Sequence, residues 1–257
     1  MSWRGRRRVH LLALTLVTVL AAATRASASQ SATLKAQLTP ERLGTGTTIS
    51  FAFQIATPNG QVPSPLRAVD FRYPAKLGLL TSGLGLTSCT PTILEEVGPE
   101  GCPRNSLVGH GDAIVEIPIG PEIIRETGQI TTWMGPVSNG HVSLLFYAEG
   151  HTPVSAELIF TGTILEAGAP FGGQLDTSIP VIPSLPGAPN AAVIEMHATI
   201  GPQNVTYFRH THGKLTPYQP EGLRLPHTCP HGGFPFAATF AFQDGTHTTT
   251  HTTVTCP

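Results

Sequence analysis

Charge is scarce in this chain of 257 residues. Asp, Glu, Lys and Arg together make up 12% of it, about half the usual quarter for a soluble protein. Fifteen basic residues oppose 16 acidic ones, for a formal net charge of −1. Nucleic-acid-binding domains normally carry a strongly basic surface, so this balance argues against a nucleic-acid partner. Aromatic residues make up only 7%, with two tryptophans, which leaves few rings on which a sugar could stack.

Long apolar runs are also lacking, because none approaches the roughly 20 residues that a membrane-spanning helix needs. A 13-residue apolar stretch, Leu11 to Ala23, follows an arginine-rich start and precedes Ala26-Ser27-Ala28. A basic end, a short apolar centre and small residues at the cleavage point predict a secretory signal peptide over residues 1–28. An uncleaved N-terminal anchor is the alternative. We therefore expect a secreted, extracellular or cell-surface protein with no membrane span after cleavage.

Removal of the signal peptide changes the charge of the protein. Five basic residues and no acidic ones leave with it, so the mature chain holds 10 basic and 16 acidic residues, a net charge of −6. Ten histidines remain in the mature chain. Because imidazoles take up protons between pH 8 and 5, full protonation would move the charge towards +4. Adhesion to acidic polymers or membranes in mild acid is one hypothesis that follows.

The four cysteines, Cys89, Cys102, Cys229 and Cys256, all lie in the exported part. An even number in an oxidising compartment predicts two disulfides. Three pairings are possible, and the local one, Cys89–Cys102 with Cys229–Cys256, is favoured because it closes no long loop. A disulfide that closes a loop as long as the one between Cys89 and Cys102 stabilises the folded protein by roughly 3 kcal/mol. Metal-binding thiols are the alternative, but the chain has no C-x-x-C motif.

Apolar and polar residues alternate repeatedly after residue 28, which is typical of half-buried strands. The pattern is clear over residues 33–38, 49–55 and 69–73. Further strands are expected near 107–117, 123–134, 141–148, 154–165, 174–182, 191–200 and 204–212. Only one short helix is predicted, with Thr90 as its cap, Pro91 at its first position and its end at Gly98.

These elements predict an all-β fold. No amphipathic helix of ten residues or more is present to connect parallel strands, so we expect an antiparallel β-sandwich, immunoglobulin-like or larger, of about ten to twelve strands. A single domain over residues 29–257 is favoured. Two stacked sandwiches with a boundary near 167–173 are the alternative.

The C-terminal segment predicts a hairpin with a turn at Asp244-Gly245. Four phenylalanines, Phe234, Phe236, Phe240 and Phe242, share one face of its first strand. A two-residue type I′ turn would bring His247 onto that face. A type I turn followed by a bulge at Gly245 would instead bring Val254 there and leave His247 and His251 in solvent. The second register buries the aliphatic residue, so we favour it.

Two motifs resemble those of uncharacterised exported proteins of soil actinobacteria. One is C-P-x-x-S-x-x-G-x-G, from Cys102 to Gly111, and the other is the closing hairpin from Cys229-Pro230 to Phe236 with the terminal Cys256-Pro257. The resemblance covers about 45 residues. It implies a secreted, β-rich protein with two local disulfides, and it implies no catalytic residue. The glycines of Gly109-His110-Gly111 are expected to allow close backbone packing in a strand.

Motifs for catalysis are missing from the sequence. No G-x-S-x-G elbow, phosphate-binding loop or dinucleotide fingerprint occurs, and the acidic residues are too scattered to nominate a catalytic pair. We therefore expect no enzyme activity and no catalytic residues. The predicted function is a non-catalytic binding or cell-surface structural role toward a protein, polymer or surface partner, with no cofactor.

The histidines offer the alternative, a zinc or copper site that could also support a metal-dependent enzyme. His210 and His212 are two residues apart, about 6.6 Å in a strand, and would point to the same face. They form a feasible chelating pair with His227, or else His231, as the third ligand. Exposed histidines on threonine-rich strands are the simpler interpretation.

Overall fold

The computed structural model describes residues 30–78, 83–151, 155–184 and 187–256. The predicted signal peptide, residues 1–28, therefore lies outside the described residues. Among the residues that are described, no helix is long and apolar enough to cross a membrane.

Strands dominate the structure, as the alternating sequence predicts. Their bounds are β1 Ser31–Thr39, β2 Gly46–Ala56, β3 Leu66–Pro74, β4 Leu107–Ile119, β5 Glu122–Met134, β6 Ser143–Gly150, β7 Ala156–Glu166, β8 Phe171–Ser178, β9 Ala192–Ile200, β10 Tyr207–Thr211, β11 Lys214–Tyr218, β12 Leu223–Arg224, β13 Phe234–Phe242 and β14 His247–Val254. The predicted strand at 174–182 starts earlier and ends at Ser178. The prediction missed β11 and β12.

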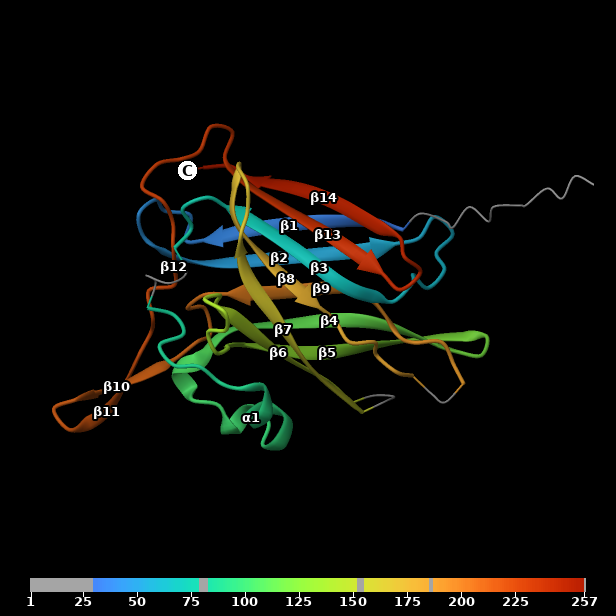
Figure 1. The fold of residues 1–257 in the computed structure, drawn as a ribbon, viewed down its shortest axis with the longest axis horizontal. Helices are drawn as coiled ribbons and strands as arrows, with labels where there is room; N and C mark the ends of the chain where they lie inside the picture. Colours follow the sequence, from blue (N-terminus) through green and yellow to red (C-terminus); the bar gives the residue numbers. More distant parts are fainter. Residues whose placement is uncertain (1–29, 79–82, 152–154, 185–186, 257) are drawn as a thin grey trace, which may run out of the picture.

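One continuous sheet joins most of these strands, in the order β1-β2-β9-β4-β5-β6-β7-β8-β3-β13-β14, and β12 adds to β2. Every pairing along this path is antiparallel. The sheet curls until its two edges, β1 and β14, lie side by side (Figure 1). The two-sheet sandwich is not confirmed, because a single ladder makes a nearly closed, barrel-like wall. Both shapes require the same alternation of apolar and polar residues.

The core fills the inside of this wall. Phenylalanines from distant strands meet there: the rings of Phe51 and Phe71 stack with centroids 4.8 Å apart, and Phe53 meets Phe240 edge-on at 4.8 Å. The closing hairpin has the bulged register, since Phe234 pairs with Val254 and Gly245 has a φ of 83°. The favoured register is thus confirmed.

The outer face is also covered at one place. Three outward side chains of β5 and β6, Trp133, Leu145 and Tyr147, form a small second core with Leu94 and the Cys89–Cys102 disulfide. Leu94 belongs to the short helix α1, Pro91–Glu96, which begins at the predicted cap: the Thr90 hydroxyl accepts a hydrogen bond of 3.3 Å from the Ile93 amide. Both local disulfides, Cys89–Cys102 and Cys229–Cys256, are confirmed.

The segment considered as a domain boundary connects two paired strands. Residues 167–170 join β7 to β8, and these strands pair directly, from Gly162 with Thr177 to Glu166 with Gly173. The ladder therefore runs through this position without a break.

Candidate functional site

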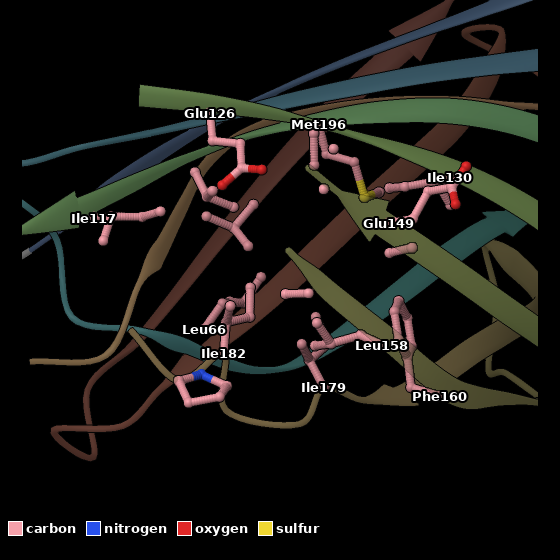
Figure 2. A pocket seen from close by; sticks show the side chains of 18 of the residues that line it. Leu66, Ile117, Glu126, Ile130, Glu149, Leu158, Phe160, Ile179, Ile182 and Met196 are labelled. Carbon is pink, nitrogen blue, oxygen red and sulfur yellow. The ribbon is translucent and has the colours of Figure 1, made fainter. Parts of the chain in front are cut away.

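An apolar cavity lies inside one end of the barrel-like sheet, and its volume is about 90 Å³. Figure 2 shows side chains converging on it from β3, β4, β5, β6, β7 and β9. Its wall includes Ala113, Ile130, Ala148, Leu158, Ile179 and Met196. One water needs roughly 10–15 Å³, so the space exceeds that of a single water several times. Apolar cavities of this kind take small apolar groups in preference to water.

Strand alternation explains why the wall is apolar. Ala148 on β6 pairs with Ile130 on β5 and with Leu158 on β7, and cross-strand partners share one face of a sheet. Ala113 on β4 likewise pairs with Met196 on β9. Small residues at two of these inward positions leave the space that larger side chains would fill. The cavity therefore follows from where alanine stands in the ladder.

Glu126 is the acidic side chain at this wall that strand alternation directs inward. It stands on β5 at an inward position, between Ile124 and Gly128, and it is 8% exposed. Its carboxylate points into the pocket in Figure 2. Its Oε1 atom lies close to Gly150 on β6: a Cβ atom added to Gly150 would be 2.6 Å from this oxygen. Ligand-binding pockets typically combine an apolar lining with a few polar groups of this kind.

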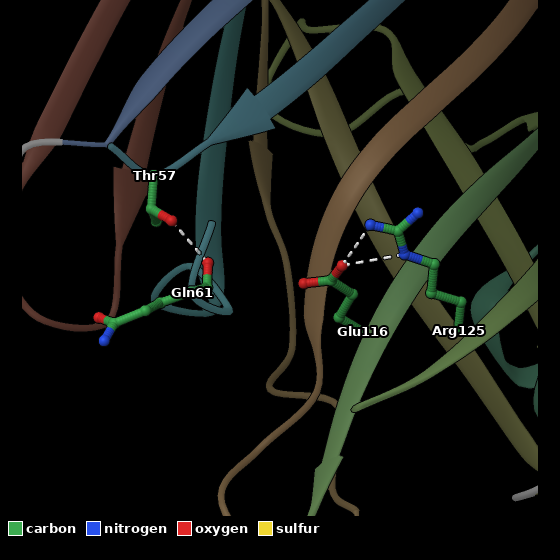
Figure 3. Close-up of polar contacts among 4 residues, drawn as sticks. All are labelled: Thr57, Gln61, Glu116 and Arg125. Carbon is green, nitrogen blue, oxygen red and sulfur yellow. Dashed lines mark hydrogen bonds and ion pairs between the residues drawn. The ribbon is translucent and has the colours of Figure 1, made fainter. Parts of the chain in front are cut away.

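A second buried carboxylate on the β4–β5 hairpin lies on the opposite face of the sheet. Glu116 on β4 faces the outer side, where Arg125 binds its Oε1 through two nitrogens at 2.8 and 3.0 Å (Figure 3). Since Arg125 and Glu126 are neighbours in the strand, their side chains point to opposite faces. Glu116 thus belongs to a cross-strand ion pair outside the sheet, whereas Glu126 belongs to the cavity.

The sequence-based reasoning missed Glu126, although a signal was present. The inward positions of the predicted strand at 123–134 are Ile124, Glu126, Gly128 and Ile130. An acidic residue in an otherwise apolar series is unusual for a strand that faces a core. It could have been identified from the alternation alone.

A smaller apolar cavity of about 50 Å³ occupies the opposite end of the interior, beside Tyr73 and Leu144. A layer of larger side chains separates the two, including the stacked rings of Phe146 and Phe160, 5.0 Å apart. The fully buried Thr132, which pairs with Phe146 across β5 and β6, faces this layer. Its Oγ1 has no hydrogen-bond partner among the described residues.

The predicted metal ligands do not meet. His210 lies on β10, but His212 lies in the following turn with a φ of 50°, so the expected placement of both on one strand face is wrong. His227 is on a separate segment, beside Gly44. Within the described parts of the chain, no group of three or more His, Cys, Asp or Glu side chains could hold a metal ion.

A polar groove of about 810 Å³ runs over the outside of β1, β2, β9 and β4. His197 is its main titratable group, with Nδ1 3.3 Å from Asp112 Oδ2 and Nε2 3.2 Å from Glu195 Oε1. Both ring nitrogens of His197 are thus directed at carboxylates of the same surface.

The chain matches no known family profile, no curated protein and no solved structure. A partly open apolar pocket whose wall includes Glu126 and Glu149 can hold a small ligand by burial and by polar contact.

Proposed function

We propose that the protein is an exported, non-catalytic binding protein that holds the apolar part of a small ligand inside its barrel-like sheet. The observation that carries the proposal is the apolar cavity with Glu126 at its wall. Binding cavities combine an apolar lining with a few polar groups that fix the ligand's orientation, and this cavity has that composition.

The lining also indicates the chemistry of the ligand. Ile130, Leu158 and Met196 offer only apolar contact, so the buried part of the ligand is a small hydrocarbon group or ring. The carboxylate of Glu126 accepts hydrogen bonds, so the adjoining part of the ligand is a donor, such as an amine. Charge-assisted hydrogen bonds of this type are stronger than neutral ones.

Two small probes separate the apolar contribution to binding from the polar one. Benzylamine has a ring and an ammonium group, whereas toluene has the ring alone. We expect calorimetric titration of the disulfide-bonded protein to show saturable binding of both. Ala148→Leu adds three carbons between Ile130 and Leu158 and should abolish binding of both. Ala52→Leu makes the same change on the outer face of β2 and should leave binding intact.

Glu126→Gln tests the polar contact. It keeps the shape of the side chain and removes its charge, so benzylamine should bind about tenfold more weakly while toluene is unaffected. Absence of saturable binding of both probes to the unmodified protein, or equal losses in the two alanine variants, would overturn the proposal.

A further inference from the structure

The β10–β11 hairpin projects from the body of the protein (Figure 1). It lies in a stretch from Met196 to Pro220 that contains no Asp or Glu, although the mature chain is predicted to be acidic overall. The hairpin itself carries Arg209, His210, His212 and Lys214, all exposed. Its charge therefore has the opposite sign to that of the rest of the chain.

The base of this hairpin is firmly held. The side-chain amide of Asn105, in the 3-10 turn η2 (Arg104–Ser106), donates to the Phe208 carbonyl and accepts from the Phe208 amide, both at 2.8 Å. The buried Tyr207 hydroxyl donates to the Leu107 carbonyl at 2.9 Å and accepts from the Gly85 amide at 2.7 Å. A projecting element with such anchoring presents its side chains in fixed positions.

Two arginines, one on the hairpin and one beside it, pack against aromatic rings. The Arg104 guanidinium lies 5.1 Å from the Phe208 ring centroid, and that of Arg209 lies 5.0 Å from the Tyr218 centroid. Within the described residues, no carboxylate forms an ion pair with either arginine or with Lys214. By contrast, Arg72, Arg125 and Arg224 each pair with a carboxylate. The charge of the hairpin is thus available to a partner.

Strand register places hydroxyl groups among these charges. Arg209 is opposite Thr216, and Thr211 is opposite Lys214, so the four side chains share one face. The two threonine hydroxyls lie 3.0 Å apart. A face that alternates cations with hydroxyl groups suits an extended chain that carries both carboxylates and hydroxyls.

We propose that the β10–β11 hairpin is a binding site for an acidic polysaccharide, with Arg209 and Lys214 as its principal contacts and Arg104 at its base. The Thr211 and Thr216 hydroxyls lie on the same face as Arg209 and Lys214. Glu221 follows the hairpin, but its carboxylate is engaged by Arg224 at 2.7 Å.

Binding to immobilised alginate, a polymer of uronic acids, tests the proposal at pH 7.5 in low salt. We expect saturable binding to alginate and none to neutral dextran. Arg209→Gln with Lys214→Gln should weaken alginate binding about tenfold. Arg209→Lys, which keeps the charge, should retain most of the affinity. Near-ultraviolet circular dichroism verifies that each variant is folded.

A matched pair of cations elsewhere distinguishes the hairpin from the charge of the whole protein. Lys35→Gln with Arg67→Gln removes the same number of positive charges from exposed positions on β1 and β3 and should leave alginate binding unchanged. Equal losses in the two double variants would overturn the site, and tighter binding to double-stranded DNA than to alginate would overturn the ligand class.

Discussion

Tyr207 shows how a single buried side chain connects the body of the protein to its projecting hairpin. The residue has no exposed surface, and its hydroxyl links Leu107 on β4 to Gly85 in the preceding loop. Burial raises the pKa of Tyr207 to about 12. Tyr147 has a pKa of about 12 as well, because it is buried and lies near Glu157 and Glu149. Both phenols are therefore neutral at all ordinary pH values.

The Tyr207 hydroxyl should stabilise the fold measurably. Tyr207→Phe leaves two partly buried backbone groups without this partner, and we expect the free energy of unfolding to fall by about 1–3 kcal/mol. Since the folded-state pKa is raised above that of the unfolded chain, near 10, the phenol's contribution is present below pH 10. It is lost as the pH rises from about 10 to 12.

Urea unfolding at pH 7.5, 9 and 11 checks this prediction. The unmodified protein should lose stability between pH 9 and 11, and Tyr207→Phe should lose less, with Tyr147 accounting for part of the remainder. Tyr218→Phe, in the same hairpin, serves as the control and should cost less at pH 7.5. An alkaline loss in Tyr207→Phe as large as in the unmodified protein would contradict the assignment.

At the scale of elements, two local structures could be predicted from residues that act within a short stretch of chain. The helix α1 was predictable because Thr90, Pro91 and Gly98 act within a few residues, and the register of the closing hairpin followed from Gly245 and Val254. The turn at His212-Gly213 was missed because both residues take a positive φ, a conformation normally signalled by Asn or Asp before glycine. The expected placement of His212 on one strand face with His210 was wrong for the same reason.

Gly109 and Gly111 show a constraint between elements that the sequence indicated correctly. Their missing side chains allow β4 to approach β9, because a Cβ at either position would collide with the backbone, at Thr199 and His197 respectively. The expectation of close backbone packing at Gly109-His110-Gly111 is thus confirmed.

Gly111→Ala should therefore destabilise the protein by about 3 kcal/mol, since the obstructing atom is a ladder carbonyl that cannot move alone. Gly168→Ala is the matched control, because a Cβ there meets nothing within 4 Å, and its effect should stay within about 1 kcal/mol. Thermal and urea unfolding measure both variants. Similar midpoints for the two would show that β4 and β9 can separate without cost.

At the scale of the whole molecule, the number of strands determines how the sheet can close. Eleven strands lie on the main path, and all ten pairings between them are antiparallel. Direction alternates at each step, so β1 and β14 must run parallel. The sequence could not reveal this arrangement, because alternation in a strand shows which side chains face inward and says nothing about its neighbours. Glu126 was recognisable as an inward residue, but the cavity around it depends on that order.

The seam between β1 and β14 is held in a different way from the rest of the wall. Gln30 stands at one end of it: the Thr248 hydroxyl donates to its carbonyl at 2.6 Å, and its side-chain amide donates to Thr246 Oγ1 at 3.2 Å. No ladder pairing joins β1 to β14 among the described strands. The sheet is therefore closed by side chains at this position, and the seam should open more easily than any other part of the wall.

Hydrogen exchange followed by mass spectrometry tests this difference in stability. Amides of β4 and β9, which pair on both sides, should exchange slowest, and those of β1 and β14 fastest. Thr248→Val removes the hydroxyl that binds Gln30 and should speed exchange at the seam about fivefold, leaving β4 and β9 unchanged. Thr250→Val, two residues along the same strand, should have little effect. A uniform acceleration across all strands would mean that the wall opens as one unit.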